Sequence, residues 1–318
     1  MVLRLVNYVP LGSAGGTVEQ RLGALRNESV VDVAQLCDLE TEDCGCTGSV
    51  VALLSCPECQ AAARQVLDQA GDAAPSVPLD QVRLLPPVPH PGKLFCLAGN
   101  YAAHIQEGGR GELQQADMAT PRIFLKPSTN TVCGTEDPIL IGRKAQFVDY
   151  EGELAVIIAR RGKYISASEA LGYVGGVTCF NDVSERRLHI WDRPEERQWD
   201  RFFDWLNGKW WDSFAPMGPC AVPLADVGDI QDLTLVTRLN GDVVQSASTG
   251  DMIFSVARTI EYVSQMVTLA PGDVIATGTP SGVGGASGRA LQPGDVVEVE
   301  IGGVGILRNP VVAEDSAV

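Results

Sequence analysis

Short apolar runs separated by turn signals dominate the chain from residue 93 onward. Runs of this kind, bounded by glycine, proline, asparagine or aspartate, are typical of β-strands. They include KLFCLAG, RIFLKP, ELAVIIA, LTLVTRLNGDVVQ, GDVIATG and GDVVEVEI. The pair Asn240-Gly241 lies between two alternating runs and predicts a hairpin. The pattern therefore predicts a β-rich region with short connections.

Helical periodicity is less frequent. Residues 251–267 repeat apolar side chains at a spacing of three or four, which predicts a helix. Residues 195–207 do the same with aromatic side chains, and all five tryptophans lie between Trp191 and Trp211. We interpret this aromatic helix as packing against the core or a subunit neighbour rather than stacking on a substrate.

The first 90 residues form a separate pattern. A strand is predicted at residues 2–9, and VALLSCPECQAAARQVLDQA predicts one helix. Residues 74–92 are rich in proline and follow neither the helical nor the strand period, which marks a boundary. We expect a small N-terminal domain over residues 1–90, ending in a Pro-rich linker, and a larger domain over residues 91–318. The fold class is then α/β, rich in β-structure.

Composition excludes several functional classes. The 318 residues carry a formal net charge of −16, which argues against nucleic acid as a partner. No apolar run approaches the roughly 20 residues of a membrane span, and the N-terminus lacks the pattern of a signal peptide. Nine cysteines without a disulfide-like framework fit a reducing compartment. These features predict a cytoplasmic protein that does not enter membranes.

Three carboxylates interrupt an apolar strand pattern at residues 148–158, VDYEGELAVII. Because side chains alternate along a strand, Asp149, Glu151 and Glu153 share one face. Their repulsion is relieved either by solvent or by a cation. Asp182 follows another apolar run, so Glu151, Glu153 and Asp182 could form an all-oxygen ligand set. Such a set suits Mg²⁺, Mn²⁺ or Ca²⁺ rather than Zn²⁺.

A second candidate is the segment GNYAAHIQE. If residues 102–107 form a helical turn, His104 and Glu107 lie on one face, and the carboxylate can orient the imidazole. The pair is then either a general base acting through water or an ordinary surface contact.

Three weaker signals remain. The Gly-rich loop TGTPSGVGGASG could hold an anion through backbone N–H groups. Lys126 and Lys209, taken alone, are typical of surface lysines. Cys44, Cys46, Cys56 and Cys59 raise a zinc alternative, with reduced free thiols as the default.

Several blocks in order resemble the fumarylacetoacetate hydrolase family. They cover roughly residues 93–312 and include CLAGNYAAHIQE, PRIFLKPSTN, VDYEGELAVII, YVGGVTCFNDVSERRL, GKWWDSFAPMGP and GDVIATGTPSGVG. The resemblance implies a catalytic domain of mixed β-sheets rolled around a central site, which is usually dimeric, with a divalent cation. Several blocks in the right order are more specific than the carboxylate spacing alone.

The resemblance also implies roles for individual residues. Glu151, Glu153 and Asp182 would bind the cation, and His104 and Glu107 would activate water. Lys209 would stabilise negative charge or supply a proton beside the substrate. The implied substrate-binding residues are Arg186 for a carboxylate, Thr279, and His189, which stands where relatives often carry a glutamine. The chain also reads NDVSERR where many relatives read NDVSARD, so these departures concern specificity.

The function that this resemblance implies is a divalent-metal-dependent hydrolase. It would cleave a C–C bond in an acylpyruvate-type 2,4-dioxo acid, with the cation as Lewis acid. The alternatives are an isomerase, hydratase or decarboxylase acting on a 2-oxo acid through an enolate. Outside catalysis, the alternatives are a noncatalytic metal-binding protein and a zinc-stabilised N-terminal interaction module. The expected partners are a small 2-oxo or 2,4-dioxo acid and a second copy of the chain in a homodimer.

Overall fold

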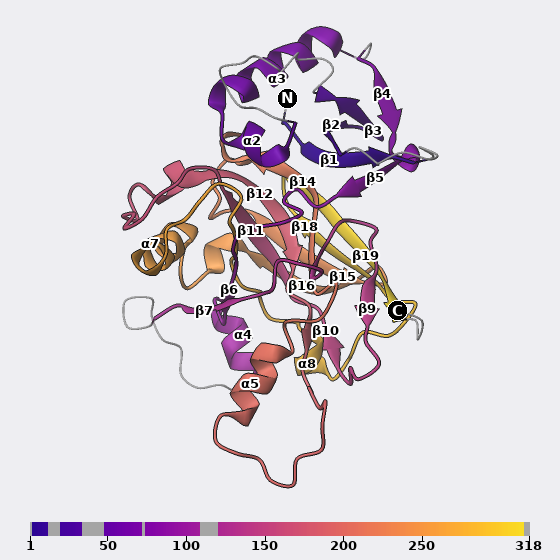
Figure 1. Cartoon of the computed structure of the whole chain (residues 1–318), viewed down its shortest axis with the longest axis vertical. Coiled ribbons are helices and arrows are strands. Elements are labelled where there is room, and N and C mark those ends of the chain that lie inside the picture. Colours follow the sequence, from indigo (N-terminus) through magenta and orange to yellow (C-terminus); the bar gives the residue numbers. More distant parts are fainter. Residues whose placement is uncertain (1, 12–19, 34–47, 72–73, 109–119, 315–318) are drawn as a thin grey trace.

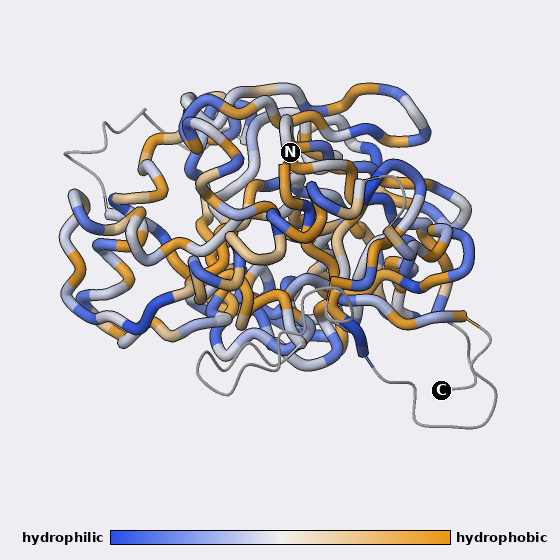
Figure 2. The backbone as a smooth tube through the Cα atoms, turned by 90° about the horizontal axis from the view of Figure 1, so that it is seen from above, coloured by the Kyte–Doolittle hydropathy of each residue, from blue (hydrophilic) through white to orange (hydrophobic). Residues whose placement is uncertain are grey.

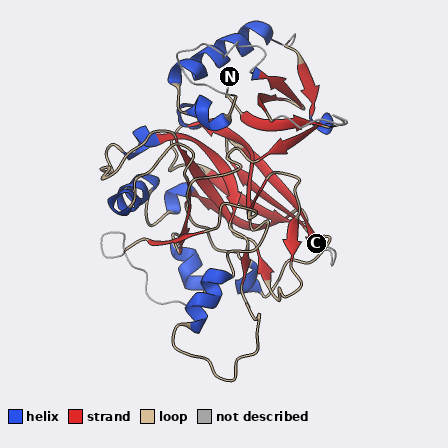
Figure 3. Cartoon of the chain, viewed as in Figure 1, coloured by secondary structure: helices blue, strands red, loops and turns tan. Residues whose placement is uncertain are grey.

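The computed structural model of the chain describes all residues except 1, 12–19, 34–47, 72–73, 109–119 and 315–318. Strands make up most of its regular structure, with short helices at the periphery (Figure 3). Apolar and polar stretches alternate along the backbone throughout (Figure 2). None of the helices in the described part is long and apolar enough to span a membrane. The predicted β-rich α/β class is confirmed.

The N-terminal elements lie together at one end of the molecule (Figure 1). They are β1 (Leu5–Pro10), β2 (Arg21–Arg26), β3 (Ser29–Asp32), α2 (Val50–Leu54), α3 (Pro57–Ala70), β4 (Ser76–Pro78), η2 (Leu79–Gln81) and β5 (Val82–Leu85). The single helix expected here is two helices, because Pro57 has no N–H to continue α2 and instead begins α3, capped by Cys56. The Pro-rich segment also contains two short strands, β4 and β5.

A large sheet runs from this end through the centre of the molecule. Beyond the N-terminal strands, it contains β6 (Leu94–Ala98), β7 (Arg122–Leu125), β11 (Gly152–Ile158), β12 (Val174–Asn181), β14 (Ala215–Pro223) and β17 (Val274–Ala276). Its strand order is β4-β3-β2-β1-β14-β12-β11-β17-β6-β7, with β5 beside β1 and β8 (Val132–Cys133) beside β14. The sheet is mixed, since β17 pairs with β6 in parallel and with β11 antiparallel.

A second sheet packs against the first. Its order is β16-β15-β18-β19-β9. The strands are β9 (Ile139–Ile141), β15 (Thr234–Leu239), β16 (Asp242–Ser248), β18 (Val296–Ile301) and β19 (Gly305–Ala313). The predicted hairpin is confirmed: Leu239 pairs with Asp242, and Asn240 and Gly241 have φ values of 55° and 88°. Leu154 and Val156 of β11 share one core with Leu235 and Val299 of this sheet.

The remaining elements are short. They are α4 (Ala102–Glu107), β10 (Val148–Asp149), η4 (Ala170–Tyr173), β13 (Ser184–Glu185), α5 (Asp200–Asn207), α6 (Leu224–Val227), η5 (Thr249–Asp251), α7 (Val256–Met266) and α8 (Gly284–Ser287). Ser255 caps α7 inside the predicted span. The aromatic helix α5 begins later than expected, because Trp199 before it adopts a left-handed conformation with φ of 76°. Figure 1 places α4 and α5 next to each other.

The expectation that the cysteines are reduced free thiols is only partly correct. Cys59 takes part in a disulfide, so reduced thiols are not the state of every cysteine. Cys56 caps α3 by accepting the backbone N–H of Cys59. The zinc alternative also needs Cys44 and Cys46, which lie outside the described residues. Cys96, Cys133, Cys179 and Cys220 are free thiols.

Candidate active site

The carboxylate strand expected over residues 148–158 is interrupted. β10 ends at Asp149 and β11 begins at Gly152, with Glu151 between them. The backbone N–H of Glu151 donates to Asn181 Oδ1 at 2.9 Å. The Asn181 side chain thus takes the place of the backbone carbonyl that would pair with this N–H in a continuous strand. The alternation of one continuous strand, on which the expected shared face of Asp149, Glu151 and Glu153 was based, therefore does not extend over all three residues. Arg186 contacts both Asp149 and Glu151, but of these two only Glu151 belongs to the cluster with Glu153 and Asp182.

Glu151, Glu153 and Asp182 converge as expected. Each offers one carboxylate oxygen, and these oxygens all lie within 4.8 Å of one another. The three side chains are buried, Glu153 completely. Burial, Asp182 and Glu151 together raise the pKa of Glu153 well above its usual range. Burial would also raise the pKa of Glu151, but Arg186 and Lys209 outweigh it and lower that pKa.

Three basic side chains neutralise much of this acidic cluster. Lys126 Nζ donates to Asp182 Oδ1 at 2.5 Å, and Lys209 Nζ donates to Asp182 Oδ2 at 2.6 Å and Glu151 Oε2 at 2.8 Å. Arg186 contacts Asp149 and Glu151. The interpretation of Lys126 and Lys209 as surface lysines is wrong, because only 3% and 2% of their surfaces are exposed.

His104 and Glu107 form the expected contact on α4. His104 Nδ1 lies 2.9 Å from Glu107 Oε1, and Glu107 Oε2 accepts the backbone N–H of Gly282 at 2.8 Å. The imidazole is thus oriented by a carboxylate that the Gly-rich loop holds in turn. Nε2 of His104 is left for a further partner.

The Gly-rich loop does bind anions, but these anions are the protein's own carboxylates. Gly278 N–H donates to Glu153 Oε2 at 2.8 Å. Gly284 and Gly285 N–H groups donate to Asp149 at 2.7 and 2.8 Å. One loop therefore positions Glu153, Asp149 and, through Gly282, Glu107. Sequence reasoning identified the loop's chemistry but not its ligands.

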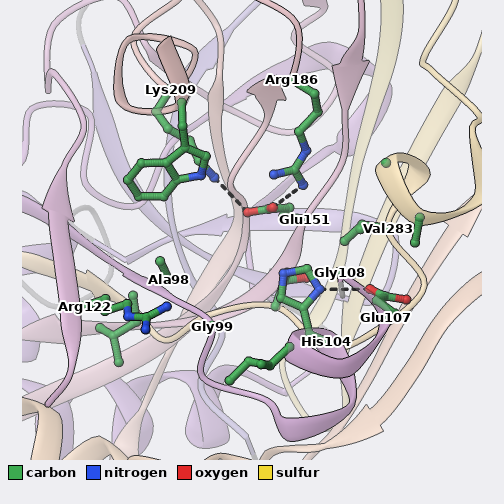
Figure 4. A pocket seen from close by; sticks show the side chains of 16 residues that line it. Ala98, Gly99, His104, Glu107, Gly108, Arg122, Glu151, Arg186, Lys209 and Val283 are labelled. Atoms are coloured by element: carbon green, nitrogen blue, oxygen red, sulfur yellow. Dashed lines mark hydrogen bonds and ion pairs between the residues drawn. The ribbon is translucent and has the colours of Figure 1, made fainter. Parts of the chain in front are cut away.

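Several of the candidate site residues line one cavity of about 430 Å³ (Figure 4). Its walls include His104, Glu107, Glu151, Arg186, Lys209 and Thr279. Thr279 donates to Gly152 O and accepts from Gln245, so its hydroxyl is already engaged. His189 is not among the lining residues: it contacts exposed Asp192 at 2.9 Å. Its expected contact with substrate stays a prediction that this arrangement does not support.

The residues present fit a divalent cation. Glu153 Oε1 is buried and has no hydrogen-bond partner in the described part of the chain. An unpaired buried carboxylate oxygen is costly unless a cation satisfies it. The donor set is entirely oxygen, as hard cations prefer. The structure therefore fits a Mg²⁺, Mn²⁺ or Ca²⁺ ion at Glu151, Glu153 and Asp182.

Comparison with known families agrees with this geometry. The family model described as fumarylacetoacetate (FAA) hydrolase C-terminal matches residues 93–312, more than half of the chain. The chain belongs to the fumarylacetoacetate hydrolase family. Its match spans the triad, the His104–Glu107 pair and the Gly-rich loop, so all three features lie within the family's shared region.

Two relatives show how far the similarity extends. An uncharacterized protein of Archaeoglobus fulgidus is 43% identical over 239 residues, 75% of this chain and 86% of that protein. A mitochondrial oxaloacetate tautomerase of Bos taurus is 38% identical over 240 residues, 75% of this chain and 72% of that protein.

A solved structure extends the likeness to the whole fold. Maleylpyruvate hydrolase from Sphingobium has a TM-score of 0.72 and 27% identity over 98% of this chain and all of that one. A second structure of that hydrolase contains manganese(II) and pyruvate. The family's hydrolases, isomerases and tautomerases indicate an enzyme, and the acidic triad with the manganese-bound neighbour supports a divalent metal.

Proposed function

We propose that the protein is a divalent-metal-dependent hydrolase that cleaves a C–C bond in an acylpyruvate-type 2,4-dioxo acid. The observation that carries this proposal is the position of the His104–Glu107 pair. It lies on the wall of the cavity that also contains Glu151 and Lys209. A base and a cation site on one cavity are what hydrolysis of a carbonyl compound requires.

The chain's own residues supply most of the steps. A bound cation at Glu151, Glu153 and Asp182 would supply Lewis acidity toward the substrate's oxygen atoms. His104 accepts a proton from water at Nε2, because Glu107 already holds Nδ1. The water oxygen then forms a bond to the distal carbonyl carbon. The C–C bond breaks with its electron pair going to the enolate of pyruvate, which takes up a proton at carbon. The products are pyruvate and a second carboxylic acid.

Two further residues support this reaction. Lys209 lies on the cavity wall with its ammonium between Glu151 and Asp182, where it can stabilise developing negative charge. Arg186 contacts Glu151 and Asp149, so it positions a cation ligand. Its expected contact with the substrate carboxylate, and that of Thr279 with the substrate, remain part of the proposal. A preference for Mg²⁺, a homodimer and a cytoplasmic location are likewise proposed.

The test compares turnover in variants of the pair. Loss of the enol absorbance of fumarylpyruvate and acetylpyruvate, with pyruvate assayed separately, is followed in Mg²⁺ or Mn²⁺. We expect His104→Ala to lower kcat by about 100-fold or more, and Glu107→Gln to lower it less. Exposed Glu195→Gln is the matched control. Wild-type rates of pyruvate formation in His104→Ala would overturn the assigned water activation.

Keto–enol tautomerisation is the second candidate, favoured by the similarity to oxaloacetate tautomerases. The same imidazole could move a proton between C3 of oxaloacetate and its 2-oxo oxygen, so that a C–H bond at C3 is exchanged for an O–H bond. No C–C bond is broken and no water is consumed. Product balance separates the two reactions. Tautomerisation changes the enol absorbance of oxaloacetate catalytically without releasing pyruvate, whereas hydrolysis of a dioxo acid releases one pyruvate per substrate consumed.

A further inference from the structure

Arg122 occupies a distinct position on the cavity wall. It is the first residue of β7 and pairs with Ala98 of β6. Its side chain lines the cavity beside Ala98 and Gly99, across from Glu107 and Val283 (Figure 4). The β-sheet therefore fixes the backbone position from which the Arg122 side chain extends. Glu151, one of the three proposed cation ligands, lies on another part of the same cavity wall.

The other strongly basic side chains of the cavity are already paired. Arg186 contacts Asp149 and Glu151, and Lys209 contacts Glu151 and Asp182. The side chain of Arg122 makes no ion pair or hydrogen bond within the part of the chain that the structure describes, and the residue is exposed. Of these three basic side chains, only that of Arg122 is both exposed and unpaired within the described residues, so its guanidinium can bind a ligand.

The charges of the site indicate what such a group would bind. Four carboxylates, those of Asp149, Glu151, Glu153 and Asp182, face three cationic side chains, Lys126, Lys209 and Arg186. Apart from Glu107, whose carboxylate contacts His104 and the N–H of Gly282, one negative charge remains, and a divalent cation would turn it into one positive charge. That balance suits the single carboxylate of a 2-oxo acid. A second carboxylate on the same ligand would need a further cation at a distance from the first.

We propose that Arg122 binds the distal carboxylate of a dicarboxylic 2-oxo acid and so selects such acids over monocarboxylic ones. A guanidinium can bind a carboxylate through two parallel N–H···O bonds, which fixes orientation as well as charge. Arg122 contacts no reacting atom, so it determines specificity rather than the chemical step. This inference rests on the proposed function, because it assigns the second end of that substrate.

The test compares Arg122→Met and Arg122→Lys with wild type on fumarylpyruvate, which has a distal carboxylate, and on acetylpyruvate, which lacks one. We expect Arg122→Met to raise the KM ratio of fumarylpyruvate to acetylpyruvate by about 10- to 100-fold, with kcat changed much less. Arg122→Lys should restore part of this ratio, because it keeps the charge but not the two-bond geometry. Arg161→Met, an exposed arginine outside the cavity lining, is the control.

Binding provides a readout that does not need turnover. Titration calorimetry of the Mn²⁺-loaded protein with oxaloacetate and 2-oxobutyrate compares two ligands that differ in the distal carboxylate. Arg122→Met should weaken oxaloacetate binding selectively. An equal effect on both ligands, or none, would overturn the role of Arg122. If wild type turns over no acid of the panel, the proposed function fails, while the calorimetric preference still decides for or against Arg122.

Discussion

Asp182 accepts hydrogen bonds from two buried ammonium groups, Lys126 on one oxygen and Lys209 on the other. Lys126 also donates to the backbone carbonyl of Val183 at 2.9 Å. Burial lowers the pKa of Lys126, although Asp182 opposes the change. The lysine is therefore held in an apolar setting mainly by its carboxylate partner, and each depends on the other.

Replacing Lys126 with methionine should destabilise the metal-free protein by about 3 kcal/mol, because a buried carboxylate loses one of its partners. Bound Mn²⁺ should reduce the loss, since it supplies positive charge to Asp182. Urea denaturation with chelator and with Mn²⁺ measures both values, and exposed Lys144→Met is the control. An equal loss in both conditions would show that Lys126 contributes through packing alone.

A second prediction concerns pH. Because burial, Asp182 and Glu151 raise the pKa of Glu153 above its unfolded value of about 4.3, its stabilising contribution is present below that value and is lost as pH rises toward the folded pKa. Glu151 has a lowered pKa and acts only at more acidic pH. The metal-free protein should therefore lose stability as pH rises from about 4.3 toward neutrality.

Denaturation of the metal-free protein across that range measures the slope. Glu153→Gln should flatten it and weaken Mn²⁺ binding about tenfold or more, while exposed Glu195→Gln should change neither. A slope in Glu153→Gln equal to that of wild type would contradict the assignment of the raised pKa.

The sequence predicted these residues unevenly. Glu151, Glu153, Asp182, His104 and Glu107 were proposed because their local spacing raised a metal site and a base as candidates, and the resemblance of the surrounding blocks to the family then favoured these roles over a solvated face and a surface contact. The burial of Lys126 was missed because its partner lies 56 residues away. No local pattern encodes such a contact, so a lysine in an apolar run was taken for a surface residue.

At the scale of elements, the loop that contains Gly278–Gly285 connects Glu153 of the acidic triad to the His104–Glu107 pair. Its N–H groups hold Glu153, Glu107 and Asp149. Gly282 has φ of +103°, and a Cβ there would lie 1.9 Å from Val244 O. Gly288 has φ of +78° but faces open space. The two glycines share a left-handed backbone and differ in what surrounds them.

Gly282→Ala should destabilise the protein by at least about 2 kcal/mol more than Gly288→Ala, because only the first meets backbone atoms. It should also lower kcat, since Gly282 N–H holds Glu107. Urea denaturation and steady-state kinetics measure the two effects. Equal stabilities and equal rates for the two variants would mean that the loop does not fix the base.

Elements with local determinants were predicted well. The Asn240-Gly241 hairpin follows from residues that accept positive φ. The break between β10 and β11 was not predicted, because it depends on Asn181 from a neighbouring strand. The late start of α5 was also missed, since nothing local indicates the left-handed Trp199.

At the scale of the whole molecule, the N-terminal elements and the central sheet share a core. Leu3, Leu5 and Leu22 belong to the same buried cluster as Ile157 and Phe180. Strand β1 also pairs with β14 through Leu5 and Ala221. The division of the chain at residue 90 stays a prediction. Because the two parts share a core, separating them would expose apolar side chains that are buried in the full chain.

Residues 91–318 alone should be less stable than the full chain, because removal of β1 and α2 exposes apolar side chains of β11 and β12. Thermal denaturation with light scattering compares the two proteins. A fragment that unfolds cooperatively at the temperature of the full chain would show that the N-terminal domain contributes no stability to the catalytic domain.

The measurement that tests the central claim most directly is the titration of metal-depleted protein with Mn²⁺ while pyruvate formation from fumarylpyruvate is followed. The account predicts no turnover in chelator and a rate that rises in proportion to bound Mn²⁺ up to about one ion per chain. Pyruvate formation that persists in the metal-depleted protein, or no turnover when one ion is bound per chain, would contradict the account.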